Sequence, residues 1–328
     1  MKSRTRNIPD WGYKLLIVIA TLIWGVSFVY MKEAVEVLHP AWLLGIRFTA
    51  TAVLLGIVFF KHVRTSLNKS ALVAGAILGV ADFVAFLFQT TGLDYTTPGK
   101  NAFLTGTYCV IVPFVYWLVA ARKPKAKNLV AALLCVVGVG FVSLTGEDSL
   151  TSMGFGDGMS LVGAVFFAVH IVLVARLAPG RDILALTVFQ FATEGLCGLA
   201  VGAVTEPWPT LASFSPNILF NLAFLVLFAS GVSVVFQNVA LAHVSPNQGA
   251  LLLSLEAVFG VICSVIMYGE VLTPALLFGF ALIFGAILVS ELDFKKKRAA
   301  VPLDANDSPE ADLLNNSPMA SEELQDLQ

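Results

Sequence analysis

Five ionisable side chains lie deep inside strongly apolar stretches of the sequence, namely Arg47, Asp82, His170, Glu194 and Glu256. An ionised group at the centre of a bilayer costs about 2.5–3.5 kcal/mol, so each of these needs a partner or access to water. At about 1.5 Å of helix rise per residue, all five fall toward the middle of their stretches. Such a cluster is typical of a water-lined route for a polar substrate, and nearby amide side chains add hydrogen-bonding groups: Gln89, Gln190, Asn221, Gln237 and Asn238.

Each of these residues also has a structural alternative. Glu256 lies in a span otherwise free of charge, where a desolvated carboxyl group is a candidate substrate contact or proton carrier. Arg47 and Asp82 lie at similar depth, so an ion pair that only packs two helices is an equal alternative. His170 and Glu194 can likewise be hydrogen-bonded helix contacts. Secondary candidates for the same route are Trp24, Gln89 and Gln237, since an aromatic ring can stack on an apolar part of a substrate.

The elements that hold these side chains are long apolar segments. Apolar residues make up 57% of the 328 residues and charged residues only 13%, against about 25% in soluble domains. Stretches of about 20 residues, the length of a helix that crosses a bilayer, recur ten times, at approximately 15–37, 41–60, 71–92, 98–120, 129–144, 158–177, 183–204, 218–242, 248–268 and 274–292. No period-two alternation points to a membrane barrel. The sequence predicts an all-α integral membrane protein with ten transmembrane helices, and Pro113 predicts a kink in the fourth.

The basic residues predict the orientation. If the N-terminus is cytoplasmic, seventeen of the twenty Lys and Arg residues fall on the cytoplasmic side, and Lys32 and Lys100 fall outside. This bias agrees with the tendency of positive loops to remain in the cytoplasm. An even number of spans then places both termini inside, and the expected location is the plasma or inner membrane.

The chain contains an internal repeat. A shift of 148 residues superposes Phe88-Gln89 on Phe236-Gln237, Leu93 on Leu241, Pro98 on Pro246, Ala102 on Ala250 and Leu104 on Leu252. Two units of five helices follow, and because five is odd the second unit is inverted relative to the first. Inverted repeats favour alternating access around a midplane site, although a duplicated bundle with a structural role is the alternative.

The sequence therefore divides into four parts. Residues 1–14 form a cytoplasmic N-terminus, 15–146 and 147–294 are the two repeats, and 295–328 form a basic and then acidic tail. The tail lacks aromatic residues, so it is expected to be disordered.

Several kinds of chemistry are not indicated. The sequence has no nucleotide-binding Gly-x-x-x-x-Gly-Lys-Ser/Thr motif, no metal-binding His-Glu-x-x-His or Cys-x-x-Cys spacing and no nucleophile elbow. The net charge of −2 gives no basic field for nucleic acid. We therefore expect neither an enzyme nor a bound cofactor or metal, and no nucleic-acid partner.

Three motifs together resemble the EamA branch of the drug/metabolite transporter superfamily. They are Ile23-Trp24-Gly25-Val26-Ser27-Phe28, the run from Pro98 to Thr105, and Leu255-Glu256-Ala257-Val258-Phe259 followed by Gly269-Glu270. The resemblance covers about residues 15–292. It implies ten helices in two inverted repeats, cytoplasmic termini, a central cavity, and export or exchange of amino acids, other metabolites or drugs. Ala257 stands where family members often have Pro, which leaves a kink there in doubt.

These features predict a carrier for small metabolites that works by alternating access, with protons as a candidate coupling ion. There are two alternatives. One is a passive channel, which would favour rings of like charge, and the other is a receptor or assembly protein, which would need a sizeable extramembrane domain. Glu256, Arg47 and Asp82 are the leading candidates for the path. Membrane lipids are expected partners, and association into a homodimer is left open.

Overall fold

The computed structural model describes residues 9–120, 123–143, 154–241, 243–244, 249 and 252–291. The described part of the chain is helical and contains no strand. The predicted acidic tail and residues 1–8 lie outside it.

Seven helices or helical runs are long and apolar enough to cross a membrane, and three shorter apolar helices accompany them within the described ranges. The first half contains α1 (Asp10–Val35), α2 (Pro40–Val58), α3 (Phe60–Thr65), α4 (Lys69–Asp94), α5 (Pro98–Gly106), α6 (Tyr108–Ala120) and α7 (Ala126–Ser143). The second half contains α8 (Phe155–Leu177), α9 (Ile183–Thr205), η1 (Leu211–Ser213), α10 (Pro216–Phe224), η2 (Leu225–Val232), α11 (Ser233–Leu241), α13 (Leu255–Cys263), η3 (Ser264–Tyr268) and α14 (Pro274–Glu291).

The helix starts follow from local sequence. Proline occupies the first turn of α2, α5 and α10, where no amide donor is needed. Side-chain oxygens accept hydrogen bonds from first-turn amides of α4, α5, α9 and α10, and they belong to Asn68, Thr97, Asp182 and Ser215.

The helical run from Pro98 to Ala120 is interrupted at Thr107, whereas the sequence places a kink at Pro113. The amide and the hydroxyl of Thr107 both donate to the Leu104 carbonyl, at 3.3 and 2.6 Å. This tighter i−3 pattern ends α5, and α6 continues through Pro113. The kink predicted at Pro113, inside α6, stays a prediction, and the break at Thr107 is a feature that the sequence did not indicate.

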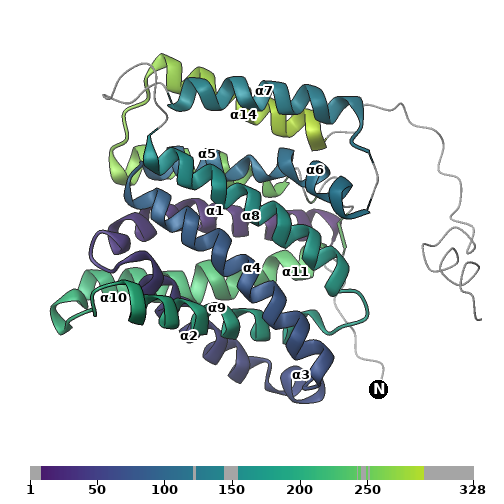
Figure 1. The fold of residues 1–328 in the computed structure, drawn as a ribbon, viewed down its shortest axis with the longest axis vertical. Helices are drawn as coiled ribbons and strands as arrows, with labels where there is room; N and C mark the ends of the chain where they lie inside the picture. The colour runs from purple at the N-terminus through teal and green to yellow at the C-terminus, as the bar shows by residue number, and fades with distance from the viewer. Residues whose placement is uncertain are drawn as a thin grey trace, which may run out of the picture. The chain divides into compact units, whose positions relative to one another are not determined.

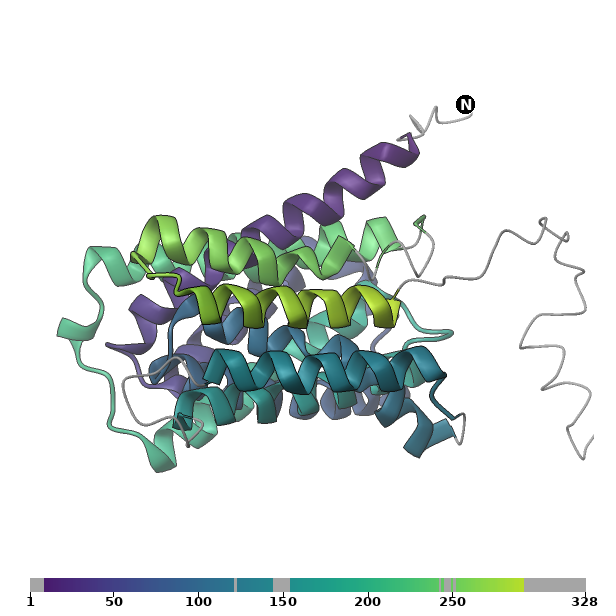
Figure 2. The ribbon, with the colours of Figure 1, turned by 90° about the horizontal axis from the view of Figure 1, so that it is seen from above.

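Helices from the two halves pack against one another. α2 lies along α9, α4 packs on both α8 and α9, and α1 packs on α13 and α11. α7 and α14 lie side by side, as Figures 1 and 2 show. The α2–α9 contact is close because glycines face each other: a Cβ on Gly198 would lie 2.5 Å from the Gly45 nitrogen. Glycine is thus required for this crossing.

Candidate functional site

Four of the predicted residues meet in one buried cluster, which we call the Arg47 cluster. Arg47 comes from α2, Asp82 from α4, His170 from α8 and Glu194 from α9. Arg47 is 3% exposed and Glu194 is fully buried. The helices that carry them belong to both halves of the chain, so the cluster lies where the halves pack together.

The amide of Gln190 connects the two carboxylates of the cluster. Its Nε2 donates to Asp82 Oδ2 at 2.8 Å and to Glu194 Oε1 at 2.9 Å. The other Asp82 oxygen lies 3.4 Å from His170 Nδ1. Two acidic groups and an imidazole are therefore gathered around one amide.

Arg47 does not pair directly with Asp82. Its Nε donates to Ser230 Oγ at 2.9 Å, and its Nη1 contacts Met31 Sδ at 3.1 Å. The guanidinium charge interacts with Glu194 and Asp82 at longer range, and its carbon lies 4.9 Å from the centre of the Phe48 ring. The sequence left open whether Arg47 and Asp82 line a substrate path or form an ion pair that only packs two helices. The structure does not contain a direct Arg47–Asp82 ion pair.

Ser230 and its neighbour Ala229 lie on η2, where the eighth predicted span has π-helical turns. The Ala229 carbonyl accepts a hydrogen bond from the Trp24 indole at 2.8 Å. Trp24 of α1 therefore reaches the segment that holds Arg47. π-helical turns recur at functional sites because they free backbone groups and re-aim side chains.

Two polar atoms of the Arg47 cluster are buried without a hydrogen-bond partner, Glu194 Oε2 and His170 Nε2. Buried polar groups are normally paired. Each of these atoms retains hydrogen-bonding capacity for a proton, a water or a substrate group.

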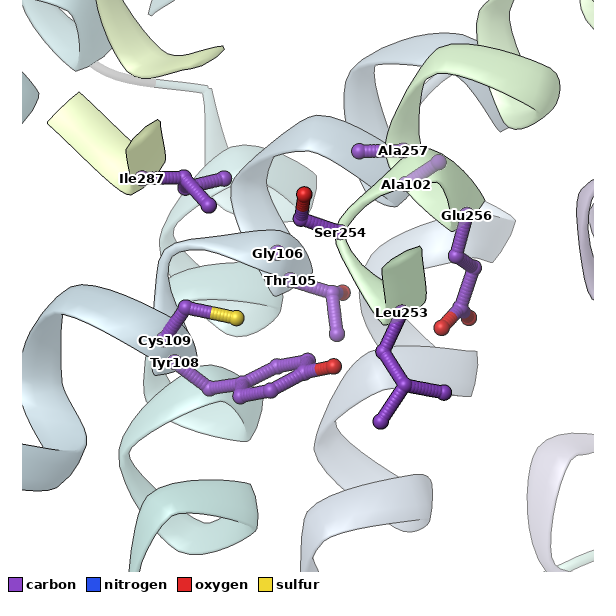
Figure 3. Close-up of a pocket in the computed structure, with 10 residues that line it drawn as sticks. All are labelled: Ala102, Thr105, Gly106, Tyr108, Cys109, Leu253, Ser254, Glu256, Ala257 and Ile287. Carbon is purple, nitrogen blue, oxygen red and sulfur yellow. The ribbon is translucent and has the colours of Figure 1, made fainter. Parts of the chain in front are cut away.

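Glu256 lies elsewhere, in the first turn of α13. It is half-buried, and its carboxylate has no hydrogen bond or ion pair with any described residue. The side chain lines a cavity of about 10 Å³, which has room for one water at most. Figure 3 shows Glu256 and Ile287 at opposite sides of the lining residues. Thr105 of α5 and Tyr108 of α6 lie between them.

Gln89 connects with this second region rather than with the Arg47 cluster. Its amide donates to Thr105 Oγ1 at 3.2 Å, and Thr105 lines the cavity beside Glu256. The backbone carbonyl of Gln89 accepts a hydrogen bond from Asn101 Nδ2, which also donates to Ser160 Oγ at 2.7 Å. Gln237, on α11, is half-buried and has no hydrogen bond with a described residue.

Glu270 caps α5. Its carboxylate accepts hydrogen bonds from Thr97 Oγ1 at 2.5 Å, from the Gly99 amide at 3.0 Å and from Ser264. A second polar contact crosses the same end of the helices, where Lys100 lies 3.6 Å from Asp157 of α8. One end of the molecule is therefore closed by contacts between the two halves.

Sequence reasoning missed the neutral members of these sites, Ser230, Thr105 and Tyr108. A hydroxyl group in an apolar span costs little and is common, so nothing in composition or spacing singles these residues out. The sequence indicates Gln190 only as a polar residue near the charged ones, because its bridging position depends on the α4–α9 crossing.

A helical bundle with several apolar spans and buried charge defines the class of this protein as a multi-pass membrane protein. The EamA-like transporter family model matches the chain twice, over residues 11–144 and 154–292. The chain belongs to the EamA-like transporter family.

Curated relatives agree with this assignment. The chain is 29% identical to an uncharacterized transporter of Archaeoglobus fulgidus over 280 residues, 84% of each chain. It is 24% identical to the S-adenosylmethionine/S-adenosylhomocysteine transporter of Chlamydia muridarum, over 86% of this chain and 92% of that one. A solved crystal structure matches with a TM-score of 0.58 at 17% identity, over 85% of this chain and 96% of its own, which supports the fold alone. The protein is therefore a membrane transporter of small molecules.

Proposed function

We propose that this transporter is a carrier for small amino-acid-like metabolites or drugs, works by alternating access, and is driven by protons. The observation that carries the proposal is the Arg47 cluster. Charged groups from α2, α4, α8 and α9 meet at the junction of the two halves, although each is costly to bury. A midplane site between repeats is what alternating access requires.

The helix contacts support ten spans arranged as two inverted repeats. If the 148-residue correspondence holds, α1 matches α8, and α4 matches the run from α10 to α11. The contact of α4 with α8 then has its counterpart in α11 with α1, and that of α6 with α8 has its counterpart in α13 with α1. Two further contacts join a helix directly to its own counterpart in the other half, namely α2 with α9 and α7 with α14. Such reciprocal pairing is expected of two related units around a pseudo-two-fold axis.

Contacts near helix ends support the orientation inferred from Lys and Arg. His62 lies in α3, soon after α2, and its Nδ1 lies 2.6 Å from Oδ2 of Asp182, the residue directly before α9. At the other end, the Glu206 carboxylate accepts from the Ala41 and Trp42 amides at 2.9 and 3.0 Å. The first contact joins segments predicted to be cytoplasmic, and the second joins segments predicted to be external. We propose a plasma or inner membrane protein with both termini in the cytoplasm.

The Asp82–Glu194 pair is the proposed coupling site. Both carboxylates contact one nitrogen of Gln190, and Arg47 supplies one positive charge for two negative ones. A single proton shared by the pair neutralises the cluster and lowers the cost of its burial. The unpartnered Glu194 Oε2 provides the position that such a proton can occupy.

Glu256 is the proposed substrate contact. The residue is partly buried and its carboxylate is unpaired among the described residues, so the carboxylate retains capacity for a cationic group. Thr105, Tyr108 and Gln89 supply hydrogen-bonding groups nearby. The relatives that transport S-adenosylmethionine support a substrate with an amino-acid moiety.

Transport assays with the purified protein reconstituted into lipid vesicles test the carrier mechanism. We expect saturable uptake of labelled substrate, accelerated by unlabelled substrate on the opposite side. Candidate substrates begin with S-adenosylmethionine and amino acids. Flux that is linear in concentration and insensitive to counter-substrate would favour the channel alternative instead.

The coupling site is tested with Glu194→Gln. This variant retains the hydrogen-bonding shape but carries no exchangeable proton, so uptake driven by a pH gradient is lost while counter-exchange without a gradient persists. Glu36→Gln, at an exposed carboxylate directly after α1, is the matched control. Undiminished gradient-driven uptake in Glu194→Gln would exclude the pair from coupling.

A further inference from the structure

A groove on the outside of the bundle has polar and apolar parts in a definite order. It measures about 470 Å³ and is lined by Lys69, Ser70, Val73, Ala74, Ile77, Leu177 and Arg181. This volume falls within the range of about 300–1,000 Å³ typical of small-molecule sites. The first turns of α4, the end of α8 and the loop before α9 form its walls.

The charged part of the groove lies at the end of a membrane span. Lys69 and Ser70 are the first residues of α4, and Arg181 lies between α8 and α9. The partial positive charge of the α4 N-terminus reinforces both cations. Asn68 caps the Ala71 amide, whereas the Lys69 and Ser70 amides have no acceptor among the described residues.

Arg181 is held in place and keeps unused capacity. Its Nη1 donates to the Leu177 carbonyl at 2.5 Å and its Nη2 to Ser70 Oγ at 2.8 Å. Its Nε is buried without a partner. The adjacent Asp182 does not neutralise it, because that carboxylate is occupied by His62 and by the Leu184 and Ala185 amides.

The rest of the groove is apolar and lies on the exposed side of α4. Val73 and Ile77 follow one face of α4, are 49% and 43% exposed, and lie opposite Leu177. From Lys69 to Ile77 the helix rises about 12 Å, from the level of the headgroups into the acyl region. An occupant must be anionic at one end and apolar beyond it.

We propose that this groove binds one phospholipid with an anionic headgroup, its phosphate against Lys69, Ser70 and Arg181 and an acyl chain along Val73 and Ile77. A soluble phosphate compound would leave the apolar floor unfilled. The charge and the order of surfaces match a lipid of the leaflet next to the start of α4. Anionic lipids are attracted by basic residues at such positions. The inference depends on membrane insertion but not on the proposed substrate or coupling.

The test is native mass spectrometry of the purified full chain with phosphatidylglycerol or phosphatidylcholine of identical acyl chains. We expect at least fivefold more phosphatidylglycerol retained. Lys69→Gln combined with Arg181→Gln brings retention to the phosphatidylcholine level. Val73→Trp fills the apolar part and lowers retention of both lipids. Lys123→Gln, an exposed change of the same charge on another loop, leaves the preference intact.

The single variant Lys69→Gln controls for misfolding of the double variant, because the Lys69 side chain makes no hydrogen bond with a described residue. It lowers the preference severalfold with an unchanged elution profile. Equal retention of the two lipids by the wild-type chain, or an equal loss in Lys123→Gln, overturns the proposal. Displacement by excess glycerol phosphate also overturns it, since that result identifies a soluble-anion site.

Discussion

At the scale of single residues, the buried charges differ in how fully they are satisfied. Arg47 and Asp82 have hydrogen-bond partners, whereas Glu194 retains one free oxygen and Glu256 lacks a partner altogether within the described part of the chain. A buried polar group that is not paired destabilises the protein, so its presence favours a functional role.

Glu256→Gln is expected to reduce transport at least tenfold, about 1.4 kcal/mol, because the amide cannot neutralise a cationic substrate group. Insertion and yield are expected to stay unchanged, since the carboxylate stabilises no described contact. Initial uptake rates in vesicles provide the measurement. Glu36→Gln, at an exposed carboxylate, should transport normally; equal rates in the two variants would remove Glu256 from the path.

At the scale of elements, side chains at helix ends form hydrogen bonds between the two halves. Glu270 caps α5 from beyond η3, and Glu206 caps α2 from the end of α9. Each carboxylate satisfies amides that the helix itself leaves free and opposes the positive end of the helix dipole. These contacts connect distant segments of sequence.

Removing the α5 cap should destabilise the fold. Glu270→Ala leaves the Gly99 amide, Thr97 and Ser264 without their acceptor, at a cost of about 1–3 kcal/mol. We expect a lower thermal midpoint of the purified protein in detergent. Glu36→Ala removes an exposed carboxylate that lies 3.7 Å from Lys32, which keeps its hydrogen bonds to the Leu93 and Asp94 carbonyls, so the midpoint is expected to change little. Matching midpoints for the two variants would contradict the assignment.

The contact between His62 and Asp182 should make stability depend on pH. Partial burial tends to raise the pKa of Asp182, but hydrogen bonds from His62 and from the Ala185 and Leu184 amides outweigh it and lower the pKa below its ordinary value. The lowered pKa stabilises the folded state above the ordinary aspartate pKa of about 3.9, and this contribution is lost as pH falls through the lowered value.

We therefore expect wild type to exceed Asp182→Asn in thermal midpoint at neutral pH, with the difference shrinking below about pH 4. Asn keeps the α9 cap and removes only the ionisable group. A constant difference across this pH range would show that charge at Asp182 is not responsible.

At the scale of the whole molecule, the two segments matched by the family model pack against each other, with α2 on α9 and α7 on α14. One end is closed by Lys100–Asp157 and by Glu270 on α5. Under the proposed alternating-access mechanism, these contacts would have to break for this end to open.

Orientation can be tested by cysteine labelling in cells. Leu211, 94% exposed on η1, is expected outside, and Lys123, in the loop before α7, is expected inside. A membrane-impermeant maleimide should label Leu211→Cys in intact cells and Lys123→Cys only after permeabilisation. The reverse pattern would invert the proposed topology.

The sequence by itself determined the helical class, several apolar spans and the presence of two repeats, because hydrophobicity and helical periodicity are local properties. Only the tertiary structure decided the partners. Similar depth favoured a contact between Arg47 and Asp82, yet the packing of η2 on α2 gives Arg47 the partner Ser230, and the crossing of α4 and α9 puts Gln190 between the carboxylates. Glu256 lies apart from them for the same reason, since side-chain partners depend on how distant helices pack and rotate.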